Sequence, residues 1–382
     1  MWSVPVSLPA VQAEFGIARA AASLPFTLTM VGFAFGGIAL GRLADWRGVT
    51  LSLLIGGAAL ACGYVVAGFA PSLPAFALAQ GALIGFGSAA SFGPLMADIS
   101  HWFERRRGIA VAICAAGNYV AGTVWPPTLQ HFIETSGWRA THIGVGIFCA
   151  ATMLPLAWLM RRRPPGHAAA HDPMLPAFVP PDNGLSPRAL QVLLCIAGIA
   201  CCVAMAMPQV HIVAYCGDLG YGAARGAEML SLMLACGIVS RVGSGFVADR
   251  IGGLATLLLG SVLQGCALFL YLLFDGLGSL YVISGLFGLF QGGIVPSYAI
   301  IVRENFAPRE AGARLGLVLM ATLGGMALGG WMSGFIFDLT GSYRIAFLNG
   351  LAWNLLNGTI VIWLLLRRGR RSFARAPADA VA

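Results

Sequence analysis

The feature that most constrains this chain is a series of long apolar segments separated by short stretches that carry arginine. A helix needs about 20 mostly apolar residues to cross a bilayer. Only 10% of the 382 residues are charged and 58% are hydrophobic, whereas an ordinary soluble domain has about a quarter charged residues. We therefore expect an all-α membrane protein, and a soluble enzyme, a disordered chain and a nucleic-acid binder are excluded. Eleven segments have the length of a span, at residues 20–41, 51–71, 74–99, 108–130, 140–160, 188–212, 227–247, 253–274, 277–301, 315–337 and 345–366.

The chain contains no lysine, since all 23 basic residues are arginine. A Walker A phosphate loop and a pyridoxal Schiff base both require lysine. The nine cysteines form no CxxC pair and lie mostly in apolar segments, which is typical of small buried side chains and not of a disulfide framework or a metal site. We expect no catalytic residues, no cofactor and no metal site.

The arginines are divided unequally between the two sides of the apolar segments. All but four lie on one side, which by the positive-inside rule faces the cytoplasm. This side includes the Pro-, Ala- and His-rich linker 164–186 and the tail 368–382. We expect the formal charge of +8 to reflect this orientation, in a bacterial inner (plasma) membrane, and not an acidic partner. The four arginines on the opposite side are Arg19, Arg139, Arg225 and Arg344.

The two halves of the sequence match each other at an offset of 204 residues. Segment 41–48 (GRLADWRG) returns as segment 245–252 (GFVADRIG), and Gly108 and Gly137 return as Gly312 and Gly341. Internal duplication is typical of transporters. It predicts an N-terminal bundle at 1–163 and a C-terminal bundle at 187–367. The partner of segment 188–212 would end near residue 8, so residues 1–10 are expected to be the outer end of a truncated first helix in a twelve-helix plan; a true eleven-helix protein is the alternative.

The repeated segment resembles the signature loop of the major facilitator superfamily. Glycine lets helix ends approach closely, and an aspartate there pairs with arginine and with a helix dipole. The first copy departs from the family pattern at Trp46, where arginine is common. The resemblance implies the major facilitator fold of two six-helix bundles, and a latch that steadies the outward-facing state; a simple loop cap is the alternative. The latch residues would be Gly41, Asp45, Arg47, Gly48, Gly245, Asp249, Arg250 and Gly252.

Three further stretches are similar to the monocarboxylate-porter branch of this superfamily, including its bacterial oxalate/formate-exchanger relatives. They are WFERRRG at 102–108, PQVHIVAY at 208–215 followed by DLG at 218–220, and FDLTGSY at 337–343. The similarity extends from Leu8 to about Arg368. It implies transport of small organic anions, but it does not identify the substrate.

Arg241 is the first candidate for a substrate-binding residue, since an ionisable side chain inside a span marks a functional site. It precedes Asp249 by eight residues, about 12 Å along a helix, and its planar guanidinium fits a carboxylate. The resemblance implies that an arginine here binds the substrate carboxylate, with an aspartate one turn earlier in animal members. That place is Gly237 in this chain, so a bound anion would supply the counter-ion. In the alternative interpretation Arg241 reaches the interface or pairs with Asp249.

Five other polar residues are candidates for substrate contacts. His211 titrates near neutral pH and shares a helix face with Tyr215. Buried amide and phenol groups need partners, which a polar cavity or a neighbouring helix would provide; for His211 the alternative is a place at the outer interface. The candidates with Arg241 are His211, Asn118, Tyr119, Tyr298 and Gln291.

Together these features predict a secondary active transporter of small organic anions, of monocarboxylate or oxalate/formate type. It would work by alternating access, either coupled to protons or as an exchanger. We expect a monomer in the lipid bilayer whose partners are the anion and protons, without nucleic acid. An exporter of hydrophobic neutral or cationic compounds is an alternative, although an unpaired arginine in its cavity would be unfavourable. A membrane receptor that binds a ligand without flux is a second alternative.

Overall fold

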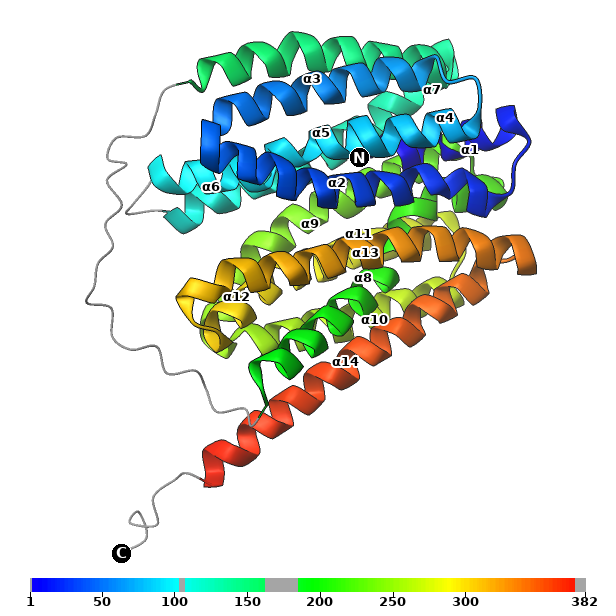
Figure 1. The fold of residues 1–382 in the computed structure, drawn as a ribbon. Coiled ribbons are helices and arrows are strands. Elements are labelled where there is room, and N and C mark those ends of the chain that lie inside the picture. The colour runs from blue at the N-terminus through cyan, green and yellow to red at the C-terminus, as the bar shows by residue number, and fades with distance from the viewer. Residues whose placement is uncertain (1, 103–106, 162–184, 375–382) are drawn as a thin grey trace, which may run out of the picture.

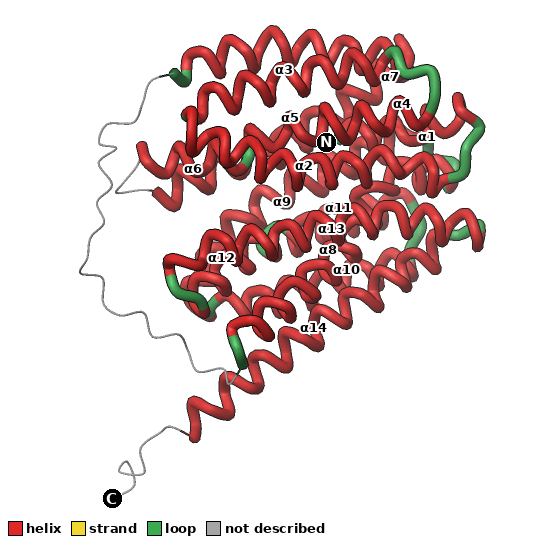
Figure 2. The backbone as a smooth tube through the Cα atoms, viewed as in Figure 1, coloured by secondary structure: helices red, strands yellow, loops and turns green. Residues whose placement is uncertain are grey.

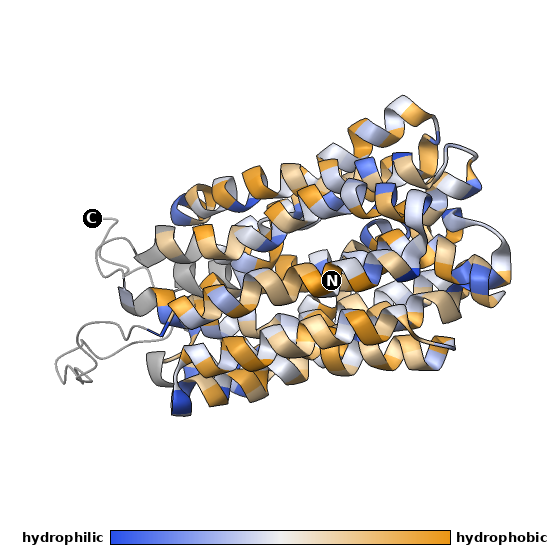
Figure 3. Ribbon diagram, turned by 90° about the horizontal axis from the view of Figure 1, so that it is seen from above, coloured by the Kyte–Doolittle hydropathy of each residue, from blue (hydrophilic) through white to orange (hydrophobic). Residues whose placement is uncertain are grey.

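The computed structural model describes residues 2–102, 107–161 and 185–374, and within these ranges the chain is helical without strands (Figures 1 and 2). This confirms the expected all-α class. Ten helices are long and apolar enough to cross a membrane. The large exposed side chains are mostly apolar, Phe35 and Phe246 among them, and apolar residues are spread along the outer faces of the helices in Figure 3. In a bilayer these faces contact lipid.

The N-terminal half contains three regular helices, an irregular span and one very long helix. The irregular span includes a π-helix and a 3₁₀ turn. In chain order, the elements of this half are α1 (Ser3–Phe15), α2 (Arg19–Arg47), α3 (Val49–Gly68), α4 (Leu73–Leu78), the π-helix η1 (Ala79–Gly85), α5 (Phe86–Ser88), the 3₁₀ helix η2 (Ala89–Ser91), α6 (Gly93–Trp102) and α7 (Arg107–Leu159). The irregular span runs from α4 to α6.

The C-terminal half repeats this plan, with one span divided at Gly292. Its helices are α8 (Pro187–Asp218), α9 (Ala223–Ile251), α10 (Gly253–Leu273), α11 (Leu277–Gln291), α12 (Ile294–Asn305), α13 (Pro308–Thr340) and α14 (Tyr343–Ala374). Helix α14 therefore continues beyond residue 367, where we placed the end of the bundle.

The eleven apolar segments correspond to these ten long helices because two of them, 108–130 and 140–160, both lie in α7. Gly137 interrupts α7 with φ 82 and ψ 158, a conformation that glycine adopts without strain. The chain reverses there, so α7 supplies two spans. Helix α1 has 13 residues, about 20 Å of helix, which is less than the apolar thickness of a bilayer.

The signature segments differ from our expectation of loops, which was wrong. Residues 41–47 are the last turns of α2, and residues 245–251 are the last turns of α9. No residue before Gly48 breaks the helix, and the turn is made by Gly48 and Gly252 alone, with φ 90 and 82. The two copies thus share one geometry: a helix that ends at a left-handed glycine and continues directly into the next span.

The two halves lie side by side, with α1–α7 in one and α8–α14 in the other (Figure 1). We call the end where α7 stops and α8 begins the linker end, and the opposite end, where α2 begins, the distal end. Across the two halves α2 packs on α13, α7 on α9, and α1 on α8. At the linker end α6 and α12 lie apart in Figure 1, so the halves meet towards the distal end.

Candidate functional site

Arg241 lies on α9 where this helix crosses α7. Its Nη1 donates a hydrogen bond of 3.2 Å to the carbonyl oxygen of Ala115, and its guanidinium carbon lies 4.6 Å from the centre of the Tyr119 ring. The Nε atom is buried without a hydrogen-bond partner. Within the described residues Arg241 forms no ion pair, with Asp249 or any other carboxylate. The guanidinium is therefore held in place by a carbonyl and a ring, and no described carboxylate neutralises its charge.

Gly237, one turn before Arg241, is where animal relatives are expected to carry an aspartate. A Cβ atom added to Gly237 would lie 2.7 Å from Cδ1 of Tyr119, closer than any ordinary contact. The Tyr119 ring, 8% exposed, thus fills the space that a side chain at position 237 would occupy. A side chain at position 237 would therefore have to displace this ring.

Tyr119 contacts Arg241 and Asn118 is its neighbour on α7, while Trp2, just before α1, is a residue that the sequence did not indicate. The Trp2 indole Nε1 donates to the Asn118 carbonyl oxygen at 3.3 Å, and the ring lies against Gly122. On the other side of the contact the hydroxyl of Ser231 donates to the Thr123 carbonyl oxygen. Besides Arg241, the polar contacts at the α7–α9 crossing therefore involve Trp2, Asn118 and Ser231.

His211 is fully buried, and its position differs from that of Arg241. Its Nε2 lies 2.8 Å from the Gly330 carbonyl oxygen and its Nδ1 lies 3.1 Å from the Tyr343 hydroxyl. Tyr215 packs edge-on against Tyr343, so the predicted pair on one helix face meets the same phenol. His211 is thus a member of a second polar group near the distal end.

Arg19 connects this group to the N-terminal half. Its guanidinium donates to the Tyr343 hydroxyl at 2.9 Å and pairs with Asp218 at 3.0 Å, and it stacks on Phe337 at 4.7 Å. Asp338 accepts hydrogen bonds of 2.7 Å from the backbone N–H groups of Arg19 and Ala20, the first free donors of α2. We call Arg19, His211, Asp218, Asp338 and Tyr343 the distal clasp.

The distal clasp was missed because Arg19 was assigned to the sparse arginines of the outer loops. The other three of those arginines also have partners: Arg139 pairs with Glu14, Arg225 with Glu228, and Arg344 donates to the Leu272 carbonyl oxygen. A signal was present, however. The stretches at 208–220 and 337–343 that carry the family resemblance contain the other four clasp residues.

Gln291 and Tyr298 form their hydrogen bonds inside the C-terminal half. Gln291 accepts a 2.8 Å hydrogen bond from Gln209. The Tyr298 hydroxyl donates to Asn357 at 3.3 Å, and Asn357 donates to Ser261. These contacts join α8 to α11 and α12 to α14 and α10. They fit our alternative interpretation, hydrogen bonding between helices.

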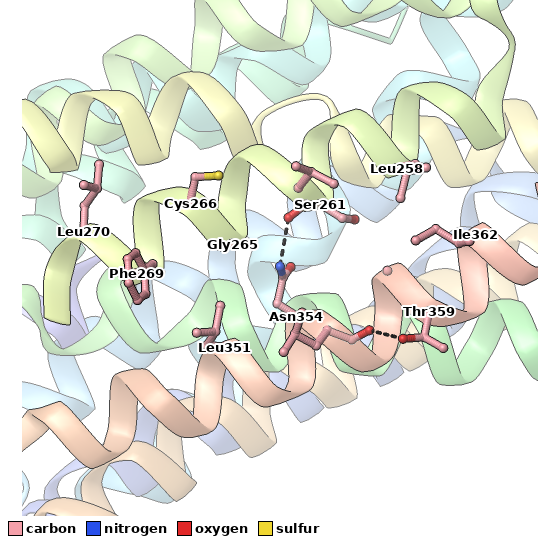
Figure 4. A pocket seen from close by; sticks show the side chains of 13 residues that line it. Leu258, Ser261, Gly265, Cys266, Phe269, Leu270, Leu351, Asn354, Thr359 and Ile362 are labelled. Atoms are coloured by element: carbon pink, nitrogen blue, oxygen red, sulfur yellow. Dashed lines mark hydrogen bonds between the residues drawn. The ribbon is translucent and has the colours of Figure 1, made fainter.

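A groove of about 500 Å³ lies between α10 and α14 and not at Arg241. Its wall is apolar apart from a few groups such as Asn354, whose amide donates to the Ser261 carbonyl oxygen at 2.8 Å (Figure 4). Half-exposed lining residues such as Val262, Phe269 and Leu355 belong to the apolar outer surface. None of our candidate residues lines this groove.

Among the described residues, the polar contacts between the halves lie between the distal end and Arg241. Besides the clasp, Thr27 donates to the Ala327 carbonyl oxygen at 2.9 Å, and α7 and α9 meet at Ser231 and Arg241. In the described residues Asp45 and Asp249 form no ion pair, and Arg47 stacks on its neighbour Trp46. Among the described residues, the halves are thus in contact at the distal end, and no ion pair joins the signature segments at the linker end.

This arrangement, two repeated helical halves that meet around a buried charge, defines a polytopic membrane protein of the transporter class. The family model described as Major Facilitator Superfamily matches residues 1–284 and again 229–381. The chain belongs to the Major Facilitator Superfamily: it is a multi-pass membrane transporter and not an enzyme.

Relatives and solved structures agree with this assignment. The chain is 27% identical to monocarboxylate transporter 13 of Bos taurus over 82% of this chain and 73% of that protein. It is 25% identical to the MFS-type transporter pynF of Aspergillus niger over 85% and 74%. Its fold is similar to that of the nucleoside transporter NupG (TM-score 0.75, 15% identity, 95% and 96% covered) and of the peptide transporter POT (TM-score 0.76, 13% identity, 97% and 92% covered).

Proposed function

We propose that this protein transports small organic anions of the monocarboxylate or oxalate/formate type by alternating access. The observation that carries the proposal is Arg241, a guanidinium at the contact between the halves that lacks a carboxylate partner and keeps a buried Nε without a hydrogen bond. An unpaired buried charge is costly, and a carboxylate would relieve that cost through charge-assisted hydrogen bonds. The similarity to monocarboxylate transporter 13 supports the same substrate class.

The site consists of groups from both halves. Arg241 would bind the carboxylate, with Tyr119 stacked on the guanidinium and Asn118 one residue away on α7. Because these groups belong to α7 and α9, a rocking motion of the halves would separate them. Gln291 and Tyr298 have partners within the C-terminal half, and we leave them out of the site. Small substrates fit this arrangement, since the ring of Tyr119 is packed directly on Gly237.

We assign the linker end to the cytoplasm. All but four of the 23 arginines lie on that side of the spans, and such an excess indicates the cytoplasmic face. The closed distal end then faces outward, and the structure represents an inward-facing state. In this state a latch that steadies the outward-facing form should be undone, and within the part of the chain that the structure describes Asp45 and Asp249 form no ion pair. We place the protein in a plasma membrane as a monomer that couples anion movement to protons or to a counter-anion.

Uptake by purified protein in proteoliposomes tests the proposal. Labelled lactate, formate and oxalate are supplied separately, with and without a pH gradient and with and without internal unlabelled anion. We expect saturable uptake of at least one anion, and its loss in Arg241→Ala. Arg225→Ala is the matched control, since it removes an arginine of the same helix whose partner is Glu228. Undiminished anion uptake by Arg241→Ala would refute the binding role, and no uptake of any anion would refute the substrate class.

A further inference from the structure

We propose that His211 is a proton-binding site that releases the distal clasp, so that the outer face opens when this histidine is protonated. The inference rests on the proposed function for its direction, since the distal end is taken as the outer face. Its test, however, requires no substrate. Three features of the clasp support it: its hydrogen bonds, the charges around it and its place between the halves.

The partners of the clasp determine which atom donates each hydrogen. Arginine has donors only, so Nη1 of Arg19 donates to the Tyr343 oxygen, and the single hydrogen of Tyr343 is left for Nδ1 of His211. A backbone carbonyl only accepts, so Nε2 of His211 carries a hydrogen and donates it to Gly330. The network is complete when His211 is neutral with its proton on Nε2. One continuous path therefore joins the imidazole to the guanidinium through one phenol.

A second proton on His211 reverses one bond of this path. Nδ1 would become a donor towards Tyr343, and the Tyr343 hydrogen would lose its present acceptor. The phenol oxygen would then lie between two cations, the imidazolium and the guanidinium of Arg19. Like charges at such short range repel each other, most strongly where water is excluded. The interaction that is weakened is the one that ties Arg19, a residue of the N-terminal half, to the C-terminal half.

The charged groups around His211 act on its protonation in opposite directions, since Arg19 disfavours a second cation and the two aspartates favour it. The groups that face His211 are Arg19 from α2, Tyr215 and Asp218 from α8, Asp338 from α13 and Tyr343 from α14. One arginine and two aspartates give the clasp a formal charge of −1 when His211 is neutral, and protonation brings it to zero. The Asp218 side chain is 36% exposed and leads from the buried network to the distal surface. A proton thus neutralises the clasp as a whole, and it weakens the contact between Arg19 and Tyr343 that joins the halves.

Release of the clasp would act on the whole distal contact. Arg19 provides the only described ion pair between the halves, since the other three lie within one half. Asp338 binds the first turn of α2 next to it. If the Arg19 side chain withdraws, the polar contacts left at this end among the described residues are the two backbone bonds to Asp338 and the bond from Thr27 to the Ala327 carbonyl oxygen. Hence a local change of one proton biases the equilibrium between two arrangements of the halves.

Distance measurements across the distal end test the inference. A ketone-bearing amino acid is introduced at Ser72 and at Gly276, which lie in exposed turns of the two halves, and each ketone is coupled to a nitroxide so that the native cysteines remain. Double electron–electron resonance then reports the distance in proteoliposomes without substrate. Between about pH 7.5 and about pH 4 we expect the population with the longer distance to rise at least about threefold.

Three variants identify the responsible group. His211→Gln keeps a donor for Gly330 and an acceptor for Tyr343 but takes up no proton, so its distances should not change with pH. His142→Gln is the matched control, because His142 is also buried but lies in the N-terminal half on the Trp138 carbonyl oxygen; it should respond as the wild type does. Tyr343→Phe removes only the joining hydroxyl, and should raise the longer-distance population at about pH 7.5 and reduce the pH response.

The possible results separate this inference from the proposed function. A wild-type distance distribution that does not depend on pH, or an unchanged pH response in His211→Gln and Tyr343→Phe, would overturn the role of His211. A response abolished by His142→Gln and kept by His211→Gln would also overturn it. If no anion is taken up but the distances respond as expected, the proposed substrate class is wrong and the proton site stands.

Discussion

Substitution of Gly237 by alanine is the sharpest test of how Arg241 is held. The new Cβ would lie 2.7 Å from Cδ1 of Tyr119, so the ring must move. Tyr119 is 8% exposed and packs under the Arg241 guanidinium at 4.6 Å, so the ring can move only by leaving that contact. The substitution is the smallest possible, one methyl group, and it changes no polar atom of the site.

Two free-energy terms give the expected size of the effect. Overpacking by one methyl group costs about 1–3 kcal/mol of stability. Loss of the cation–π contact costs about 0.5–2 kcal/mol, which corresponds to an increase of about 2- to 30-fold in the KM of an anion bound by Arg241. Tyr119→Ala removes the obstacle, so the double variant Gly237→Ala with Tyr119→Ala should regain stability relative to Gly237→Ala but keep the raised KM.

The assay combines thermal unfolding in detergent with initial rates of anion uptake in proteoliposomes. Gly243→Ala is the control, since Gly243 lies on the same helix and no atom lies within 4 Å of its added Cβ. It should leave both quantities unchanged. Equal unfolding temperatures and equal KM values for Gly237→Ala and Gly243→Ala would refute the packing of Tyr119 on Gly237 and the positioning of Arg241 derived from it.

Three further predictions concern other contacts. In Gly334→Ala the added Cβ lies 2.9 Å from the Arg19 carbonyl oxygen, so the longer distal distance should be more populated than in Gly324→Ala, whose Cβ meets nothing within 4 Å; equal populations would contradict this. The hydrogen bond from Arg139 holds the pKa of Glu14 below its ordinary value of 4.5, so the pair stabilises the fold above that pH and its contribution is lost as the pH falls through the lowered pKa. Glu14→Gln should therefore unfold at a lower temperature than the wild type near pH 7, and the difference should shrink towards pH 3. A difference that stays constant with pH would speak against the ion pair. Tyr298→Phe removes a bond within the C-terminal half and should cost about 0.6 kcal/mol of stability with an unchanged KM, and a raised KM would return Tyr298 to the binding site.

The fold was predictable because its signals are local or repeated. Apolar segments report spans directly, and the 204-residue offset reports two equivalent halves. The errors lie where backbone geometry decides. Residues 41–47 contain no helix breaker, so the signature segment is helical up to Gly48. In α7, by contrast, the sequence separated the spans 108–130 and 140–160, and the structure has the break between them at Gly137.

The candidate site was predictable only in part, because its contacts join distant residues. Arg241 was identifiable as a charge within an apolar segment. Arg19 was not, since its partners Asp218, Asp338 and Tyr343 are 199 to 324 residues away, and no local pattern reports such a distance. The role of Gly237 was equally hidden, because it depends on the ring of Tyr119 that occupies the space above it. His211 was identified as a candidate for substrate contact because it titrates near neutral pH, but its contacts with Gly330 and Tyr343 place it in the distal clasp.

The polar contacts between the halves have a common form outside the distal clasp: a side chain of one half donates to a backbone carbonyl of the other. This holds for Thr27 on Ala327, Ser231 on Thr123 and Arg241 on Ala115. A backbone carbonyl oxygen is present whichever side chain its residue carries. An alanine scan would therefore detect the donors and pass over the acceptors, and the acceptor positions are free to vary in evolution as long as they stay small. Genetic covariation between the halves should accordingly be weak here, even though the halves touch.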